Sequence, residues 1–463
     1  MKRKKNTGRL VLAAAAAAAA SLISGCALSA LTAENVMEPP QPFGDGAAIQ
    51  AVLEEALGPQ ITLRYPRSGE YRSAVVRADV DNDSNEEAIV FYRQATENTG
   101  AHMALLDINE EEEWALIGEY SGSEGEIDRV MFGDVDGDGV QDIITGWSVH
   151  SDYGTLRVHS CANGRLTSLS IDSSPQTGAG AYSSYSELSV VDFDRDSVDE
   201  LLTVCLPGDE NSGVARLMEW NKPIFPGGSG RIILRDSITL SAGTKAYTGC
   251  AAGQLSRSVY GFVVDSQRTD GSYSSEVLVW DSEAGRLTSP SEQEGSKVFS
   301  RTLTTASMDI DGDGYIEIPD DSLMPDCDTG TAGKVYMTDW YRYGESGFVR
   351  DFSSVMRLDY GYYFILPESW RGIVTAQPDN ETRSLHFYLA NSGYPFSNEL
   401  MCIKVFTLDE WEEENSGGWN EEPSGYIELY TADYYVYAVQ LFSSPPYIEV
   451  TLEMITECFV LQV

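Results

Sequence analysis

The chain of 463 residues is long enough for two or three domains, and its 42% hydrophobic and 10% aromatic content is sufficient for large buried cores. A formal net charge of −41 excludes a basic surface for nucleic acid or for anionic membranes. A folded and strongly acidic chain fits an extracellular protein that recruits cations.

Residues 1–25 have the layout of a bacterial export signal. Five basic residues precede an apolar run from about Leu10 to Ile23, which is too short to span a bilayer. The sequence ISGC that ends at Cys26 resembles a lipobox, in which the cysteine is lipidated and becomes the new N-terminus. An ordinary cleaved signal is the alternative. We expect a protein of the cell membrane, lipid-anchored on its extracytoplasmic face and touching the membrane only through that anchor.

Residues 26–48 include PPQP and are predicted to be a tether between the lipid and the fold. The stretch AAIQAVLEEALGP then predicts a short helix, because Ile49, Val52 and Leu53 share one face and Gly58-Pro59 ends it.

An acidic motif recurs downstream, and FGDVDGDGVQDII at residues 132–144 is its clearest copy. The other copies are ADVDNDSNEEAIVFY, VDFDRDSVDELLTV and MDIDGDGYIEI. The first aspartates of the four copies lie 55, 58 and 117 residues apart. Because the last interval is about twice the others, we predict a unit without acids near residue 250, at GCAAGQLSRSVYGFVVD.

Each unit reads as four short strands rich in Val, Ile, Leu, Thr and aromatic residues. Five such units between about 60 and 357 predict a mainly β fold, a β-propeller of about five blades, within a domain spanning 49–357. An open stack of strands is the alternative. Residues 62–73 are expected to add a strand that helps to close the ring. The repeat then stops, and 358–463 is predicted to be a small α+β domain.

The alternating acids predict up to four structural Ca²⁺ sites. Positions one, three and five supply carboxylates, position seven a backbone carbonyl and position nine a further acid, which together can enclose one ion. The predicted ligands are Asp79, Asp81, Asp83, Asn85 and Glu87; Asp134, Asp136, Asp138, Val140 and Asp142; Asp192, Asp194, Asp196, Val198 and Glu200; and Asp309, Asp311, Asp313, Tyr315 and Glu317. Only the second and fourth copies carry glycines at the turns. A solvated acidic turn is the alternative, and EF-hands are excluded because position twelve is Val90, Thr145 or Thr203 in three copies.

The copy DVDGDGVQDIITG, preceded by Phe132-Gly133, resembles the FG-GAP/VCBS repeats of integrin-α-type β-propellers over roughly residues 70–350. That resemblance implies a calcium ion in a loop between two strands of one blade, where it stabilises the fold. The chain departs from the family in one unit without acids and in having fewer blades than the seven of integrin heads. The arrangement also resembles uncharacterised bacterial lipoproteins with a GEYRSA-like segment and a YYFILPESW-like C-terminal domain, which implies a location but no activity.

Other residues give weaker signals. Beyond Cys26 there are six widely spaced cysteines, which could form three disulfides or serve as small core residues: Cys161, Cys205, Cys250, Cys327, Cys402 and Cys458. The four histidines, His102, His150, His159 and His386, are each isolated in the sequence and are expected to be surface or core residues. Aromatic residues of the C-terminal domain could form a ligand surface, but packing is favoured: Tyr362, Tyr363, Trp370, Tyr430, Tyr434, Tyr435 and Tyr437.

No motif for a nucleophile, a catalytic zinc or a phosphate loop occurs. We therefore expect a monomeric, non-enzymatic binding or scaffold module whose ligand is a protein or a glycan. A purely structural envelope component is one alternative. The other is a carbohydrate-active enzyme, which requires two acids outside the loops about 5–10 Å apart in a pocket.

Overall fold

The structure, a computed structural model, describes residues 45–95, 100–109, 111–122, 125–148, 153–162, 164–172, 181–206, 212–223, 229–292, 297–326, 335–390, 396–415, 425–432 and 434–461. The predicted signal, the lipobox cysteine and nearly all of the tether lie outside these residues. The chain divides into two units, residues 1–59 and 60–463. No helix within the described residues is long and apolar enough to cross a membrane.

The described part of the first unit is the helix α3 (Asp45–Leu57), which confirms the predicted helix and begins a few residues earlier. Ile49 and Leu53 are buried, as their shared face predicts. The helix ends at Gly58, whose φ of 91° suits a residue without a Cβ and whose amide donates to the Glu54 carbonyl over 3.0 Å.

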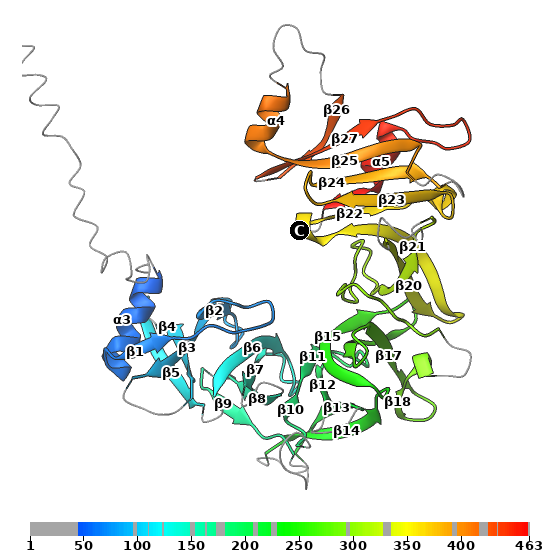
Figure 1. The fold of residues 1–463 in the computed structure, drawn as a ribbon. Coiled ribbons are helices and arrows are strands. Elements are labelled where there is room, and N and C mark those ends of the chain that lie inside the picture. Colours follow the sequence, from blue (N-terminus) through cyan, green and yellow to red (C-terminus); the bar gives the residue numbers. More distant parts are fainter. Residues whose placement is uncertain are drawn as a thin grey trace, which may run out of the picture. The chain divides into compact units, whose positions relative to one another are not determined.

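The described strands of the second unit form six antiparallel sheets, and Figure 1 colours their strands in chain order. Each sheet is built from consecutive strands, except that β28 joins sheet five after the strands of sheet six. Sheet one contains β1 (Ile61–Leu63), β2 (Val75–Ala78), β3 (Glu87–Gln94), β4 (His102–Ile108) and β5 (Trp114–Ser121). Sheet two contains β6 (Glu126–Gly133), β7 (Asp142–Ser148), β8 (Gly154–Ser160), β9 (Thr167–Leu169) and β10 (Ser184–Tyr185). Sheet three contains β11 (Glu187–Val191), β12 (Glu200–Cys205), β13 (Val214–Asn221) and β14 (Arg231–Thr239).

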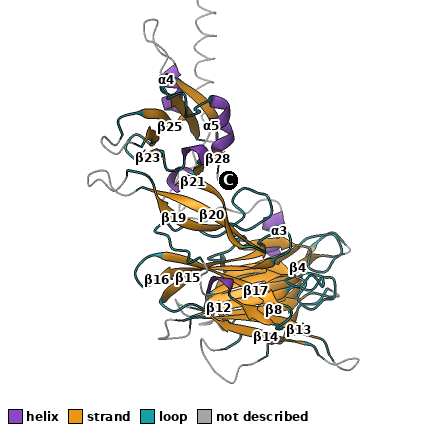
Figure 2. Ribbon diagram, turned by 90° about the vertical axis from the view of Figure 1, so that its right-hand side faces the viewer, coloured by secondary structure: helices purple, strands orange, loops and turns teal. Residues whose placement is uncertain are grey.

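Sheet four is the predicted unit without acids. It contains β15 (Thr244–Gln254), β16 (Tyr260–Arg268), β17 (Tyr273–Asp281) and β18 (Arg286–Thr288), and is followed by the 3₁₀ turn η2 (Pro290–Glu292). The β15–β16 hairpin falls where the doubled interval places it, so this prediction is confirmed. The mainly β class and the repeated antiparallel units are also confirmed, and Figure 2 shows how strongly strands dominate.

Sheet five joins the repeats to the C-terminal region. It contains β19 (Ile318–Leu323), β20 (Tyr336–Gly344), β21 (Gly347–Arg357), β22 (Tyr362–Ile365) and β28 (Phe459–Leu461), with η3 (Leu358–Tyr360) between β21 and β22. Arg357 pairs with Tyr362, and Tyr362 pairs with Leu461. Strands on both sides of the predicted boundary at 357/358 therefore belong to one sheet.

Sheet six has the order β23 (Val374–Asp379), β24 (Ser384–Leu389), β25 (Glu399–Thr407), β27 (Tyr435–Leu441) and β26 (Tyr426–Thr431). The turn η4 (Glu368–Trp370) precedes it, and the helices α4 (Leu408–Asn415) and α5 (Leu452–Cys458) complete an α+β region. One hydrophobic core spans sheets five and six, with Phe364, Trp370 and Phe387 among its members. The aromatic residues noted in the C-terminal region fall into two groups by exposure. The buried ones are Tyr362, Tyr363, Trp370 and Tyr437, and the exposed ones are Tyr430, Tyr434 and Tyr435.

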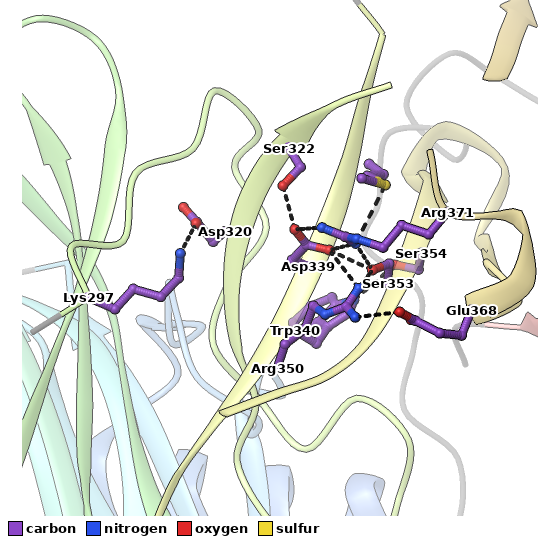
Figure 3. Close-up of polar contacts among 11 residues, drawn as sticks. Lys297, Asp320, Ser322, Asp339, Trp340, Arg350, Ser353, Ser354, Glu368 and Arg371 are labelled. Carbon is purple, nitrogen blue, oxygen red and sulfur yellow. Dashed lines mark hydrogen bonds and ion pairs between the residues drawn. The ribbon is translucent and has the colours of Figure 1, made fainter. Parts of the chain in front are cut away.

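A buried ion pair fastens η4 to sheet five (Figure 3). Asp339 on β20 is almost wholly buried and binds both terminal nitrogens of Arg371, which follows η4. Ser322 and Ser353 donate to the same carboxylate. Burial opposes ionisation of Asp339, but these hydrogen bonds outweigh it and hold the pKa of the carboxyl below its ordinary value.

We expect Arg371→Met to lower the free energy of unfolding by about 3 kcal/mol, because it leaves the buried Asp339 carboxylate without its main partner. Chemical denaturation of the full chain measures this. The control is Arg383→Met, which removes a surface pair with Glu410 and is expected to cost less than about 1 kcal/mol. Equal losses in the two variants would contradict the assignment.

Candidate metal centres

The four acidic motifs form loops between strands. Loop one (79–87) leads into β3, loop two (134–142) joins β6 to β7, loop three (192–200) joins β11 to β12, and loop four (309–317) leads into β19. Their residues are numbered here as positions one to nine.

Backbone amides bind the same carboxylates in every loop. In loop two, Asp134 at position one accepts from Gly137 over 2.8 Å and from Gly139 over 2.9 Å. The acid at position nine accepts the amide of position two: Val80 donates to Glu87 over 2.7 Å, Val135 to Asp142 over 3.0 Å, Phe193 to Glu200 over 2.9 Å and Ile310 to Glu317 over 3.1 Å. Position two is apolar throughout. The bond therefore links the acid to a buried side chain in loops one to three and to the partly buried Ile310 in loop four.

Positions four and six have positive φ in all four loops. Glycine occupies them in loops two and four, with φ between 71° and 91°. Loops one and three use Asn82, Ser84, Arg195 and Ser197, with φ between 65° and 74°. The loops without glycine therefore adopt the same backbone, at a strain of about 1 kcal/mol per residue.

This backbone gathers three of the predicted ligands. Positions one, three and nine each place a carboxylate oxygen within 4.8 Å of the other two, and the four groups are Asp79, Asp81 and Glu87; Asp134, Asp136 and Asp142; Asp192, Asp194 and Glu200; and Asp309, Asp311 and Glu317. Position five lies outside these groups. Its carboxylate instead accepts the amide of position seven, so that Asp83 binds Asn85, Asp138 binds Val140, Asp196 binds Val198 and Asp313 binds Tyr315. Each group could hold a metal ion.

The position-nine acids carry the largest electrostatic cost. All four are buried, and Glu87 is 0% exposed. Burial, with a smaller contribution from neighbouring aspartates, raises the pKa to about 7 in Glu87 and Glu200 and to about 8 in Asp142 and Glu317. Such a group takes up a proton on folding when no cation is bound. Its contribution to stability then falls as pH rises from the ordinary pKa, 3.8 for Asp142 and 4.5 for the three glutamates, through 7–8.

Arginine offsets this charge in loops three and four. Arg235 on β14 places Nη1 2.8 Å from Asp194 and 3.6 Å from Glu200. Arg342 on β20 places Nε 2.9 Å from Glu317, Nη1 2.7 Å from Asp313 and Nη2 3.4 Å from Asp311. A guanidinium therefore lies among the carboxylates of both loops.

Loops one and two are different. Among the described residues, no lysine or arginine forms an ion pair with positions one, three or nine in these loops. In loop one, Oε1 of Glu87 is buried without a hydrogen-bond partner, while Oε2 accepts from Val80. A buried charged oxygen without a partner is costly, so this position needs a cation or a proton.

Neighbouring units are linked at position eight. The amide of Asp199 in loop three donates to the Asp134 carbonyl of loop two over 2.7 Å, and the Asp134 amide donates back to the Asp199 carboxylate over 2.8 Å. The amide of Ile316 in loop four donates over 2.8 Å to the carbonyl of Gln254, at the start of the turn without acids. The turns of sheets two and three, and those of sheets four and five, therefore contact one another.

The cysteines and histidines noted in the sequence are the remaining candidates, and the structure brings some of them together in one cluster. The five described cysteines beyond the tether form no disulfide with one another, and Cys327 lies outside the described residues, as does His150. His159 is buried beside Ser168, and burial lowers its pKa to about 4. His386, which was expected to be a surface or core residue, lies with Glu399 and Cys402 in a group whose ligand atoms are within 4.8 Å of one another. Sequence reasoning missed this group because its members come from two strands.

No protein-family model matches the chain, and no curated protein matches it. The solved structures that are similar to it include the following two. The crystal structure of BBS1N in complex with ARL6DN, soaked with lead, shares 10% identity over 82% of this chain and 95% of its own, with a TM-score of 0.27. The exo-β-1,3-galactanase 1,3Gal43A from Clostridium thermocellum shares 11% identity over 83% of this chain and 97% of its own, with a TM-score of 0.29. Likeness at these TM-scores supports no conclusion about function.

We expect Ser197→Gly to raise the stability of the chain by up to about 1 kcal/mol, because glycine adopts the φ of 70° at this position without strain. Chemical denaturation measures the change. Ser237→Gly is the matched control, since Ser237 is an exposed residue of β14 in the same sheet with ordinary strand geometry, and glycine there is expected to destabilise. A loss of stability in Ser197→Gly would show that the loop has another backbone.

Proposed function

We propose that the chain is a calcium-stabilised β-propeller of the FG-GAP/VCBS type, a lipoprotein anchored through Cys26, that acts as a non-enzymatic binding module on the extracytoplasmic face of the membrane. The observation that carries the calcium assignment is Glu87, a fully buried acid with one oxygen unpartnered, gathered with two aspartates in a loop geometry that occurs four times. The contacts between successive turns support the propeller.

The donor atoms favour calcium over softer metals. Each loop offers carboxylate and carbonyl oxygens and neither sulfur nor imidazole, which is the ligand set of a hard cation. Several carboxylates within 4.8 Å repel one another unless a positive charge lies between them. An ion that binds the folded loop and not the unfolded chain stabilises the fold by mass action.

The positions of Arg235 and Arg342 indicate which loops bind calcium. A guanidinium among carboxylates supplies donors and a permanent charge, so loops three and four have an internal counterion. A calcium ion entering these loops must displace Arg235 or Arg342. We therefore assign the calcium sites to loops one and two, and expect two bound ions rather than four.

We expect the full chain to bind two calcium ions at pH 8 by calorimetric titration, and chelation to lower its melting temperature. Glu87→Gln keeps an acceptor for the Val80 amide but removes a charged ligand, and is expected to leave one ion. Glu119→Gln, at an exposed position of β5, is the control and should retain two. A chain that binds no calcium, with a melt unchanged by chelation, would exclude the metal assignment. Four ions in the wild type would overturn only the role of the arginines, and Arg342→Gln tests that role directly because it should add one ion.

The exposed tyrosines of sheet six are the proposed binding surface. Tyr430 is 50% and Tyr434 76% exposed, on and beside the edge strand β26, and Tyr435 and Ile427 are exposed nearby. Tyrosine rings bring apolar area together with a polar hydroxyl, which suits a wet interface. The strongly acidic chain repels anionic partners, so a neutral glycan is favoured over an acidic one.

We expect the full chain to bind neutral glycans on an array, and Tyr434→Ala to reduce that binding at least tenfold. Tyr65→Ala removes another exposed ring, 63% exposed, from a different part of the chain and should leave binding unchanged. Binding should persist in EDTA, because sheet six contains none of the acidic loops. Absence of glycan binding by the folded chain would favour a protein ligand or a purely structural role.

The alternative is a carbohydrate-active enzyme, which needs a carboxylic acid that remains protonated near neutral pH. Among the described residues, the carboxyl groups whose pKa rises to about 7 or 8 all belong to the acidic loops. One cavity outside the loops is lined by Asp270 and Glu276. Asp270 is exposed and hydrogen bonds from Ser272 lower its pKa, while Glu276 accepts both the amide and the hydroxyl of Ser241 over 2.9 Å. This pair supplies no general acid, so the binding role is preferred.

A further inference from the structure

A polar cluster lies on one face of sheet six, away from the acidic loops. His386 on β24 pairs directly with Cys402 on β25, so both side chains project from the same face of the sheet. Met401 pairs with Phe387 on the other face, where both belong to the hydrophobic core. His386 and Cys402 therefore form a polar pair on the face of the sheet opposite the core residues Phe387 and Met401.

A β-bulge brings Glu399 to this face. Two residues, Leu400 and Met401, separate Glu399 from Cys402, so in a regular strand Glu399 and Cys402 lie on opposite faces. The register shifts between Phe387 and Tyr388, however, so that Tyr388 pairs with Glu399 and Leu400 is left over. Leu400 and Met401 both enter the core, and Glu399 turns towards His386. Bulges commonly redirect a side chain in this way at functional positions.

The three side chains are in contact. His386 Nδ1 lies 2.5 Å from Glu399 Oε1, and Cys402 Sγ lies 3.8 Å from His386 Nε2. One ligand atom from each residue lies within 4.8 Å of the other two. Cys402 is 1% exposed, whereas the side chains of His386 and Glu399 are 26% and 27% exposed, so an ion can reach the cluster from the side of these two residues.

We propose that His386, Glu399 and Cys402 form a binding site for a transition-metal cation of the zinc class. One imidazole nitrogen, one carboxylate oxygen and one thiolate sulfur make a donor set of borderline softness, which suits Zn²⁺ or Co²⁺ and differs from the all-oxygen loops. Binding forms a metal–sulfur bond and releases the thiol proton to water. Three protein ligands leave a fourth tetrahedral position for a water molecule.

The same residues do not form a nucleophilic site. Burial raises the pKa of Cys402 to about 11, so the thiol is neutral without a cation, and a neutral thiol is a poor nucleophile. The hydroxyl of Ser384 lies 2.7 Å from His386 Nε2 and orients the ring. Neither of the two cavities described in the structure is lined by His386 or Cys402. The mixed nitrogen, oxygen and sulfur ligand atoms of the cluster suit a metal ion.

Addition of Co²⁺ to the metal-free full chain tests the site. We expect a near-ultraviolet thiolate-to-cobalt charge-transfer band and a visible band of tetrahedral cobalt, both of which Zn²⁺ abolishes and excess Ca²⁺ does not. The acidic loops contain no sulfur and cannot give the first band, so this readout is independent of the calcium sites.

Variants identify the ligands. Cys402→Ser should remove the charge-transfer band, and His386→Gln should weaken cobalt binding at least tenfold. Cys458→Ala alters a cysteine of the same region whose sulfur lies beside Met454 and should leave the band intact. Circular dichroism confirms that each variant is folded. No band in the wild type, or a band that survives in folded Cys402→Ser, would overturn the proposal.

Discussion

The hydrogen bond from the amide of position two to the buried acid of position nine determines the form of every acidic loop. It links an apolar residue at position two, such as Val80 or Phe193, to a carboxylate that is buried away from water. Burying that charge is unfavourable unless a positive charge accompanies it. The loops meet this requirement differently: Arg235 and Arg342 supply a guanidinium to loops three and four, whereas Oε1 of Glu87 remains unpartnered in loop one.

The unit without acids shows which contacts of the hairpin do not depend on carboxylates. Leu255 occupies the place of the apolar residue at position two and is fully buried, and Gln254 provides the carbonyl that accepts the amide of Ile316. Both the core contact and the link to the next turn survive without carboxylates. Packing and the position-eight bond therefore hold sheet five to sheet four without acids in sheet four, and the acids of the other units add a charged site to such a turn.

The sequence was sufficient to predict features with a local or periodic signal. Acids at alternate positions, repeated at a fixed interval, predicted four loops, and the doubled interval predicted the β15–β16 hairpin. Arg235 and Arg342 gave no such signal, because each reaches its loop from a strand more than twenty residues further along the chain. The pairing of β28 with β22 was equally hidden, since Phe459 and Phe364 meet only when the C-terminus returns to sheet five. Loops one and three lack the glycines but keep the same backbone, because residues such as Ser197 and Arg195 adopt the left-handed conformation.

Two features of the backbone bring potential metal ligands together in this chain, and the two resulting groups differ in their donor atoms. In the loops, positive φ at positions four and six folds alternate side chains to one side, and the donors are uniformly oxygen. In sheet six, the extra residue Leu400 resets the alternation of β25, so that an acid joins a histidine and a cysteine. Hard and borderline cations prefer different donor sets, so under the two proposals the acidic loops and the cluster of sheet six would not compete for the same ion. Regular strands alone would bring together neither group, because strict alternation keeps Glu399 and Cys402 on opposite faces.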